Sequence, residues 1–187
     1  MNHIQIYDNI LSKKSCDDII KIFEESPDKG VGIIGERKII DKSRKDSIDL
    51  CLQLSSTRNE GESKIREYVV NAMTICTKRY KKKYPFLNDI DPWMIYDDYN
   101  IQKFNDGGGY HKVHCEQSHD ETSRIIVWMI YLNNAKCGTR FYYPTRDIRA
   151  RRGRVVMWPS AWTHPHSGIT PNKGDKYIIT GWYSFVS

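Results

Sequence analysis

The most constraining feature of the sequence is a change in hydrophobic periodicity near residue 95. From there to the C-terminus, β-branched and aromatic runs alternate with Gly, Pro and Asn: MIYDDYNIQKF, RIIVWMIYL, GRVVMWP and KYIITGWYSFV. Such runs favour strands, and the residues between them favour turns. Residues 125–132, IIVWMIYL, are apolar on both faces, as expected of a central strand covered on both sides. The pattern predicts an all-β C-terminal half, folded as a sandwich or barrel.

The N-terminal half predicts mainly helices that support this β core. The segment NHIQIYDNI alternates apolar and polar residues like an edge strand, and Ser12 or Ser15 can cap the helix that follows. Residues 26–60 give weaker signals and are expected to form loops with short strands. A second helix is expected over residues 62–84, with one apolar stripe at steps of three and four residues: Ile65, Val69, Met73, Cys76 and Tyr80.

Length and composition are those of one ordinary globular domain. With 187 residues, of which 39% are hydrophobic and 28% charged, the chain is long enough for one buried core. No apolar run reaches the roughly 18 to 20 residues of a membrane helix, and the first residues show no hydrophobic signal region, which favours a cytoplasmic protein. The five cysteines are scattered and form no CxxC pair, which favours reduced thiols over a disulfide framework.

Positive charge gathers in two segments of a chain whose net charge is +6: KRYKKKY at residues 78–84 and TRDIRARRGR at residues 145–154. Lysines at the end of a helix complement its dipole, and arginines at a strand edge oppose edge pairing. The sequence therefore favours a solvated surface, with contact to nucleic acid or an acidic substrate as the alternative. The charge and glycine content of residues 30–60 also predict a lid that gates access to a site.

The segment YHKVHCEQSHD, residues 110–120, gathers histidines and acids directly after a run of glycines. On a strand, His114 and Glu116 would share one face, because successive side chains point to opposite faces. A third ligand would have to come from elsewhere, and His164 and His166 also lie two residues apart. Two histidines and one carboxylate on one face of an ion leave positions open, which suits non-haem Fe(II) and oxygen chemistry. Zinc also accepts this donor set, but no thiolate pair supports it here.

Three segments, in this order, resemble those of a known family: GGGYHKVHCE, RIIVWMIYLNNAKCGTRF and GRVVMWPSAWTHPHSGITPNKGDKYIITGWY. They are similar to the 2-oxoglutarate (2OG) and Fe(II)-dependent oxygenases, particularly the prolyl 4-hydroxylase-like branch. The resemblance implies one domain, residues 1–187, of α+β class. Its core would be a double-stranded β-helix, or jelly roll, formed by residues 95–187. Residues 1–94 would supply N-terminal helices packed on one outer face of that core.

The resemblance also implies roles for particular residues. His114 and Glu116 match the first two iron ligands, and His166 matches the third because it lies ten residues before Lys176. Lys176 would bind the distal carboxylate of 2OG, a charge-assisted contact in a mostly dry pocket. Tyr131 matches a tyrosine that hydrogen-bonds the same carboxylate. Most relatives carry Asp in place of Glu116, so the ligand here is longer by one methylene. Two further positions are expected to line the pocket: Thr180 and Trp182.

By the same resemblance, the protein is an enzyme that uses Fe(II) and 2OG, with ascorbate as an iron reductant, to hydroxylate a C–H bond. The expected substrate is a prolyl residue of a protein or peptide, and 2OG would be converted to succinate and carbon dioxide. Oxygenases of nucleic acids or small molecules use the same iron chemistry, but KYIITGW lacks the additional arginine expected of the nucleic-acid branch. A non-catalytic jelly-roll module that binds a partner is the remaining alternative.

Overall fold

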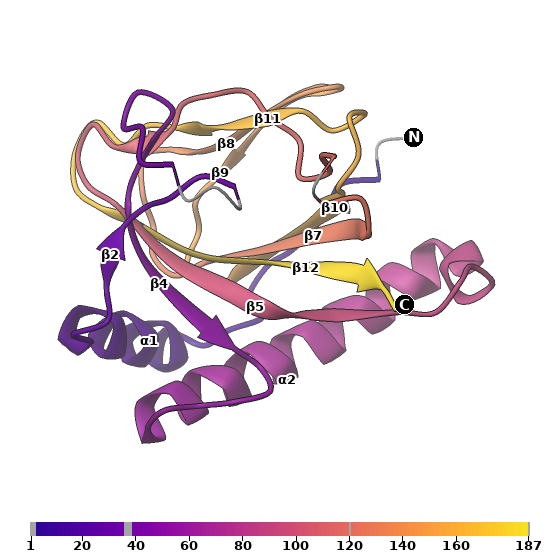
Figure 1. Ribbon diagram of the computed structural model, residues 1–187, viewed down its shortest axis with the longest axis horizontal. Coiled ribbons are helices and arrows are strands. Elements are labelled where there is room, and N and C mark those ends of the chain that lie inside the picture. Colours follow the sequence, from indigo (N-terminus) through magenta and orange to yellow (C-terminus); the bar gives the residue numbers. More distant parts are fainter. Residues whose placement is uncertain (1–2, 36–38, 120, 187) are drawn as a thin grey trace.

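Two β-sheets face each other, and two helices cover the outer face of the larger sheet (Figure 1). The structure is a computed structural model that describes residues 3–35, 39–119 and 121–186. The larger sheet has the strand order β1-β10-β7-β12-β5-β4-β2, and the smaller sheet has the order β11-β8-β9. Strands β3 and β6 form a separate pair. This is the arrangement expected of a jelly roll with helices on one outer face.

The larger sheet takes strands from both halves of the chain. It contains β1 (Gln5–Tyr7), β2 (Gly30–Val31), β4 (Ile48–Gln53), β5 (Trp93–Phe104), β7 (Arg124–Tyr131), β10 (Arg154–Pro159) and β12 (Lys176–Phe185). The smaller sheet contains β8 (Gly138–Tyr142), β9 (Thr145–Arg149) and β11 (His166–Ile169). The separate pair is β3 (Lys45–Asp46) and β6 (Gly109–Tyr110). The helices are α1 (Lys13–Glu25), α2 (Glu60–Lys83) and the short 3₁₀ helix η1 (Pro85–Asn88).

Both long helices expected from the sequence are present, and each buries an apolar face. Helix α1 begins after Ser12, whose Oγ accepts a hydrogen bond from the backbone N–H of Ser15 at 3.0 Å. The predicted stripe of α2 is buried at every position: Ile65, Val69, Met73, Cys76 and Tyr80. These side chains pack with α1 against the larger sheet, so the helix predictions are confirmed. In the described part of the chain, no helix is long and apolar enough to cross a membrane.

Strand β7 lies between β10 and β12 in the larger sheet, and both of its faces are covered. Trp128 and Ile130 pack toward the helices, whereas Val127, Met129 and Tyr131 pack between the two sheets. Fully burying one such side chain contributes about 1.5–3 kcal/mol, so a strand covered twice anchors both hydrophobic layers. The prediction of a central strand at residues 125–132 is therefore confirmed.

The N-terminal half contributes more to the larger sheet than its sequence suggested. Strand β4 pairs with β5 along all of its residues and extends the sheet beyond the all-β half. The signal was the alternation in IDLCLQ, where Leu50 and Leu52 face the helices. This run is short and lies among charges and glycines, which favour loops, so the sequence pattern alone did not distinguish it from a loop.

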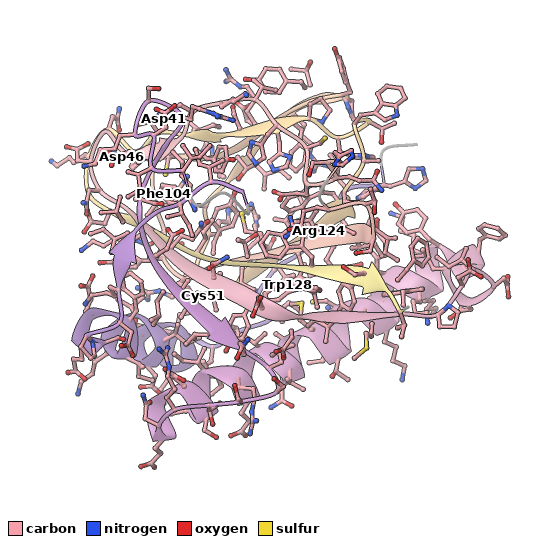
Figure 2. The ribbon with its side chains drawn as sticks, viewed as in Figure 1. Asp41, Asp46, Cys51, Phe104, Arg124 and Trp128 are labelled. Atoms are coloured by element: carbon pink, nitrogen blue, oxygen red, sulfur yellow. The ribbon has the colours of Figure 1, made fainter. Side chains whose placement is uncertain are left out.

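A cavity of about 750 Å³ opens between the smaller sheet and the β5-β4-β2 side of the larger one. Figure 2 labels three of its lining residues, namely Cys51 on β4, Phe104 on β5 and Arg124 on β7. Most of the site residues predicted from the sequence lie on its walls. The fold therefore places the cavity where strands from distant parts of the chain meet.

Candidate metal centre and cofactor pocket

The structure brings His114, Glu116 and His166 together on the cavity wall. One ligand atom from each lies within 4.8 Å of the others. Two backbone hydrogen bonds join His114 and His166, at 3.0 and 2.8 Å, and form an isolated bridge where β11 begins. The backbone N–H of Glu116 donates to the carbonyl of Ser160 at 3.0 Å, which fixes the loop next to the end of β10. Within the described ranges, no other group of His, Cys, Asp or Glu converges in this way.

The hydrogen bonds of the two histidines aim unprotonated nitrogens at the carboxylate. Nδ1 of His114 lies 2.9 Å from the carbonyl oxygen of Lys112, and Nδ1 of His166 lies 3.0 Å from that of His164. A carbonyl only accepts, so in the neutral rings the proton sits on Nδ1 and Nε2 carries a lone pair. Both Nε2 atoms approach Oε1 of Glu116, at 3.4 and 3.3 Å. Three electron-pair donors around one point fit a divalent cation.

Packing fixes the orientation of both rings. The Tyr110 ring stacks on His114 with centroids 3.8 Å apart, and Phe141 and Trp158 contact His166 at 5.4 and 5.1 Å. A metal site needs ligands that are held before the metal binds, and aromatic packing of this kind supplies that rigidity. The donor set and its support therefore both fit a bound metal ion.

Glu116 remains ionised in this environment. Burial raises the pKa of its carboxyl, but without a metal the His114 and His166 imidazoles lower it further when they carry a proton on Nε2, by hydrogen bonding and by positive charge, so the net pKa lies well below the usual range. The indole N–H of Trp182 donates to Oε2 at 3.0 Å. The sequence placed Trp182 on the pocket wall but did not reveal this hydrogen bond, because the contact depends on the path of a loop 66 residues earlier in the chain.

His164 lies outside the cluster, although sequence spacing alone left it as a candidate. Its Nδ1 is 2.9 Å from Oγ1 of Thr163, and its ring lies 6.5 Å from that of His3. Burial, assisted by the neighbouring imidazoles, lowers the pKa of His164 to about 4. Its backbone carbonyl supports His166, whereas its side chain does not face Glu116. Geometry and sequence spacing thus select the same histidine.

The expectation of a regular strand through His114 and Glu116 was wrong. Between residues 111 and 119 only His114 takes part in β pairing, through its isolated bridge to His166. The two side chains still converge, because backbone hydrogen bonds to β11 and to Ser160 hold the loop in place. Strand parity therefore grouped the correct two side chains, but hydrogen bonds of a loop, and not a regular strand, bring them together.

Lys176 lies 2% exposed on the cavity wall without a carboxylate partner. Its Nζ donates to the carbonyl oxygens of Gly138 and Ile169 at 3.2 and 3.3 Å and lies 4.6 Å from the centroid of the Phe104 ring. No carboxylate oxygen of the described residues lies within 4.0 Å of it. Burial lowers the pKa of Lys176 to about 8. A desolvated cation of this kind fits an anionic ligand group.

Tyr131 is not on the cavity wall, in contrast to the direct contact expected for it. Its hydroxyl shares a hydrogen bond of 2.7 Å with Oγ1 of Thr139 and donates to the carbonyl of Ile148 at 3.4 Å. Thr139 itself lines the cavity, together with the expected Thr180 and Trp182. Thr139 was not among the site residues predicted from the sequence, although it lies in the GTRF segment. Tyr131 reaches the cavity only through Thr139.

Comparison with known proteins agrees with this geometry. Residues 99–184 match the family model described as the 2OG-Fe(II) oxygenase superfamily. The match covers somewhat less than half of the chain and shows a similarity to this superfamily. The matched residues include the three converging side chains and Lys176, so the matched segment supplies the inner part of the cavity. No curated protein matches the sequence.

Solved structures similar to this chain include several prolyl hydroxylases. A Trichoplax adhaerens prolyl hydroxylase in complex with a peptide of hypoxia inducible factor is 16% identical, with a TM-score of 0.77, covering 98% of this chain and 84% of that one. A Pseudomonas putida prolyl-4-hydroxylase is 12% identical, with a TM-score of 0.72 and coverages of 98% and 94%. The viral collagen prolyl hydroxylase of Paramecium Bursaria Chlorella virus-1, in its 2OG complex, is 17% identical, with a TM-score of 0.61 and coverages of 99% and 97%. These likenesses confirm the jelly-roll fold.

Proposed function

We propose that this protein is a 2OG- and Fe(II)-dependent dioxygenase that hydroxylates a C–H bond, with a prolyl residue of a protein or peptide as substrate. The observation that carries the proposal is one cavity that holds a His-Glu-His donor set and, apart from it, a buried unpaired lysine. When bound, the iron and 2OG supply the oxidising chemistry, in which oxygen is consumed and 2OG becomes succinate and carbon dioxide.

The residues of the cavity divide this work among them. His114, Glu116 and His166 would hold the metal on one side and leave its other positions open. Lys176 would bind the far carboxylate of 2OG by a charge-assisted contact. Thr139 would offer a hydroxyl on the same wall, held in place by Tyr131. The remaining inner wall includes apolar side chains that exclude water from the site: Phe104, Met129, Trp158 and Ile178.

A peptide suits the outer part of the cavity better than a small molecule. The cavity continues from the metal centre along β5, where Tyr96, Asp98 and Asn100 line it, and reaches β2 and the residues that follow it. An extended chain could lie along this open, polar floor and present one residue to the metal. The Trichoplax relative was solved with a peptide bound, which supports the same substrate class.

The basic segment 145–154 gives little support to a nucleic-acid substrate. Two of its five arginines pair with acids of the same chain, since Arg154 contacts Asp8 at 2.6 Å and Arg152 contacts Asp17 at 3.5 Å. No residue of this segment lines the cavity. These charges thus lie outside the cavity, and two of them hold the N-terminal strand and helix by ion pairs.

A lid over the site remains a prediction for residues 30–60. Gly30, Val31, Ile33 and Ile34 line the outer cavity, so part of the segment lies where a lid would act. Residues 36–38 of the predicted lid lie outside the described residues. Hydrogen exchange with and without a bound peptide would measure the motion, and equal protection in both states would contradict gating.

The proposed function is tested by peptide-dependent turnover. Protein loaded with Fe(II), 2OG and ascorbate is expected to form succinate when a library of proline-containing peptides is added, with a mass gain of one oxygen on the proline. The same peptides with alanine in place of proline are the control. Succinate and oxidised product from nucleic acid but not from peptides would contradict the substrate assignment. Absence of any 2OG turnover with every substrate class would contradict the enzymatic role.

The affinity for 2OG is expected to fall at alkaline pH. Lys176 has a pKa of about 8 in the folded protein and 10.5 as its ordinary value. Below pH 8 it is charged and can bind the carboxylate, whereas above pH 8 the Kd of 2OG should rise toward tenfold per pH unit. Its depressed pKa also means that the unfolded state binds more protons between pH 8 and 10.5, so the free energy of unfolding without 2OG rises with pH there.

Calorimetric titration of 2OG in the presence of Mn(II), from pH 7 to pH 9.5, measures this effect. Lys176→Met is the reference, since it removes the titrating group and should show a flat affinity over the same range. An affinity that does not change with pH in the unmodified protein would contradict the proposed role of Lys176.

A further inference from the structure

The two oxygens of the Glu116 carboxylate have different surroundings. Oε1 faces Nε2 of His114 at 3.4 Å and Nε2 of His166 at 3.3 Å. Oε2 faces away from that point, accepts the indole N–H of Trp182 at 3.0 Å, and lies 4.0 Å from Nη1 of Arg124. One oxygen is therefore free to meet a metal, and the other is already bound to the protein.

We propose that Trp182, supported by Arg124, is a positioning residue that holds Oε2 and leaves Glu116 to bind the metal through Oε1 alone. This inference rests on the proposed iron site and adds an assignment to it. Trp182 acts through the carboxylate and not on the substrate. Its role is to fix the direction of a flexible ligand side chain, as hydrogen-bonded partners of metal ligands do elsewhere.

The backbone of β12 is built to aim this indole. The register between β12 and β5 shifts between Gly181 and Tyr183, which places Trp182 at a bulge, and bulges redirect side chains next to active sites. A Cβ at position 181 would lie 2.2 Å from Cζ2 of Trp128, so glycine is required immediately before Trp182. The indole is 9% exposed, and a buried indole N–H needs an acceptor, which Glu116 provides.

Arg124 fixes the other side of the same indole. Its guanidinium lies 3.9 Å from the centroid of the Trp182 ring, a cation–π contact. Nη2 contacts Oε1 of Glu121 at 2.7 Å, and Nη1 donates to the backbone carbonyl of Glu116 at 3.4 Å. Arg124 thus ties the ring of Trp182 to the loop that carries the carboxylate, and its charge adds to the field that favours ionised Oε2.

The arrangement depends on the length of the glutamate side chain. The extra methylene extends the side chain by about 1.5 Å, one carbon–carbon bond. An aspartate on the same backbone would fall short of either the histidine nitrogens or the indole. A longer ligand also has one more rotatable bond, and the hydrogen bond from Trp182 offsets that freedom by selecting one direction.

The test measures metal affinity without turnover. Dissociation constants for Mn(II) are obtained from the EPR signal of the free ion for the unmodified chain, Trp182→Phe, Glu116→Asp and the double variant. Trp182→Phe keeps a six-membered aromatic ring under Arg124 and removes the five-membered ring that carries the N–H donor. We expect it to weaken Mn(II) binding about tenfold, the lower end of the effect of partners of metal ligands. In the Glu116→Asp background the same change is expected to alter affinity less than twofold.

Trp93→Phe is the matched control, because its indole N–H donates to the carbonyl of Leu87 at 2.9 Å, outside the cavity. It should leave the Mn(II) affinity unchanged. If Trp182→Phe does not fold, Arg124→Gln provides a second route, and a loss of severalfold is expected. Equal losses in the Glu116 and Asp backgrounds, or no loss, would overturn the inference alone. Failure of the unmodified chain to bind Mn(II) would overturn the metal site itself.

Discussion

Replacing His166 by alanine is expected to abolish divalent metal binding, whereas replacing His164 by alanine leaves it nearly intact. His166 supplies an Nε2 that faces Oε1 of Glu116 at 3.3 Å, so its loss removes one of three donors. We expect the Kd for Fe(II) under anaerobic conditions to rise by more than about 100-fold, beyond the effect of removing a residue that only supports a ligand. Equilibrium dialysis with iron analysis measures it.

The His164→Ala variant is a matched control for the same turn. The bond from His164 to Nδ1 of His166 is made by a backbone carbonyl, which alanine retains. Metal affinity should therefore change by less than about threefold, although burial of the imidazole means that unfolding should be checked by circular dichroism. Loss of metal in His164→Ala with retention in His166→Ala would reverse the assignment of the third ligand.

Replacing Lys176 by methionine is expected to weaken 2OG binding strongly and to spare the metal. Methionine retains the length and apolar stem of the side chain and removes the charge. Truncating one partner of a buried charge pair costs about 2–5 kcal/mol, so the Kd of 2OG should rise by on the order of 30-fold or more. Titration of 2OG into the Mn(II)-loaded protein, followed by calorimetry, measures the change.

Two readouts separate this role from a structural one. The affinity for Mn(II) should not change, because Lys176 contacts backbone carbonyls and Phe104 and not the metal-binding group. The free energy of unfolding without 2OG should not fall, because the variant removes a buried charge that has no acidic partner among the described residues. Lys173→Met, an exposed lysine of the preceding turn, is the control. Unchanged 2OG affinity in Lys176→Met would contradict the assignment.

Local patterns predicted those parts of the fold in which one periodicity is long. The apolar stripe of α2 and the continuous apolar run of β7 can be recognised in the sequence, because many residues repeat the same hydrophobic pattern. Short strands were expected within residues 26–60, but the position of β4 was not identified, because six residues with two buried leucines, beside charges and glycines, resemble a loop. The position of β4 in the sheet depends on its pairing with β5, and this pairing cannot be predicted from the sequence of β4 alone.

The candidate site was also only partly predictable from the sequence. Spacing and resemblance predicted the grouping of His114, Glu116, His166 and Lys176, since side-chain chemistry is readable from sequence. The directions of hydrogen bonds were not readable. The bond from Trp182 to Glu116, and the position of Thr139 in front of Tyr131, depend on where distant strands cross. These tertiary contacts decide which residues touch a ligand and which support those that do.

The most direct test of the central claim is the visible absorption of anaerobic protein as Fe(II) and then 2OG are added. A ferrous ion that is held by the three proposed ligands and chelated by a 2-oxo acid should give a weak charge-transfer band that needs both components. We expect this band in the unmodified chain, its retention in His164→Ala and its absence in His166→Ala. Absence of the band in the unmodified chain at saturating concentrations of Fe(II) and 2OG would contradict an oxygenase site at this cavity.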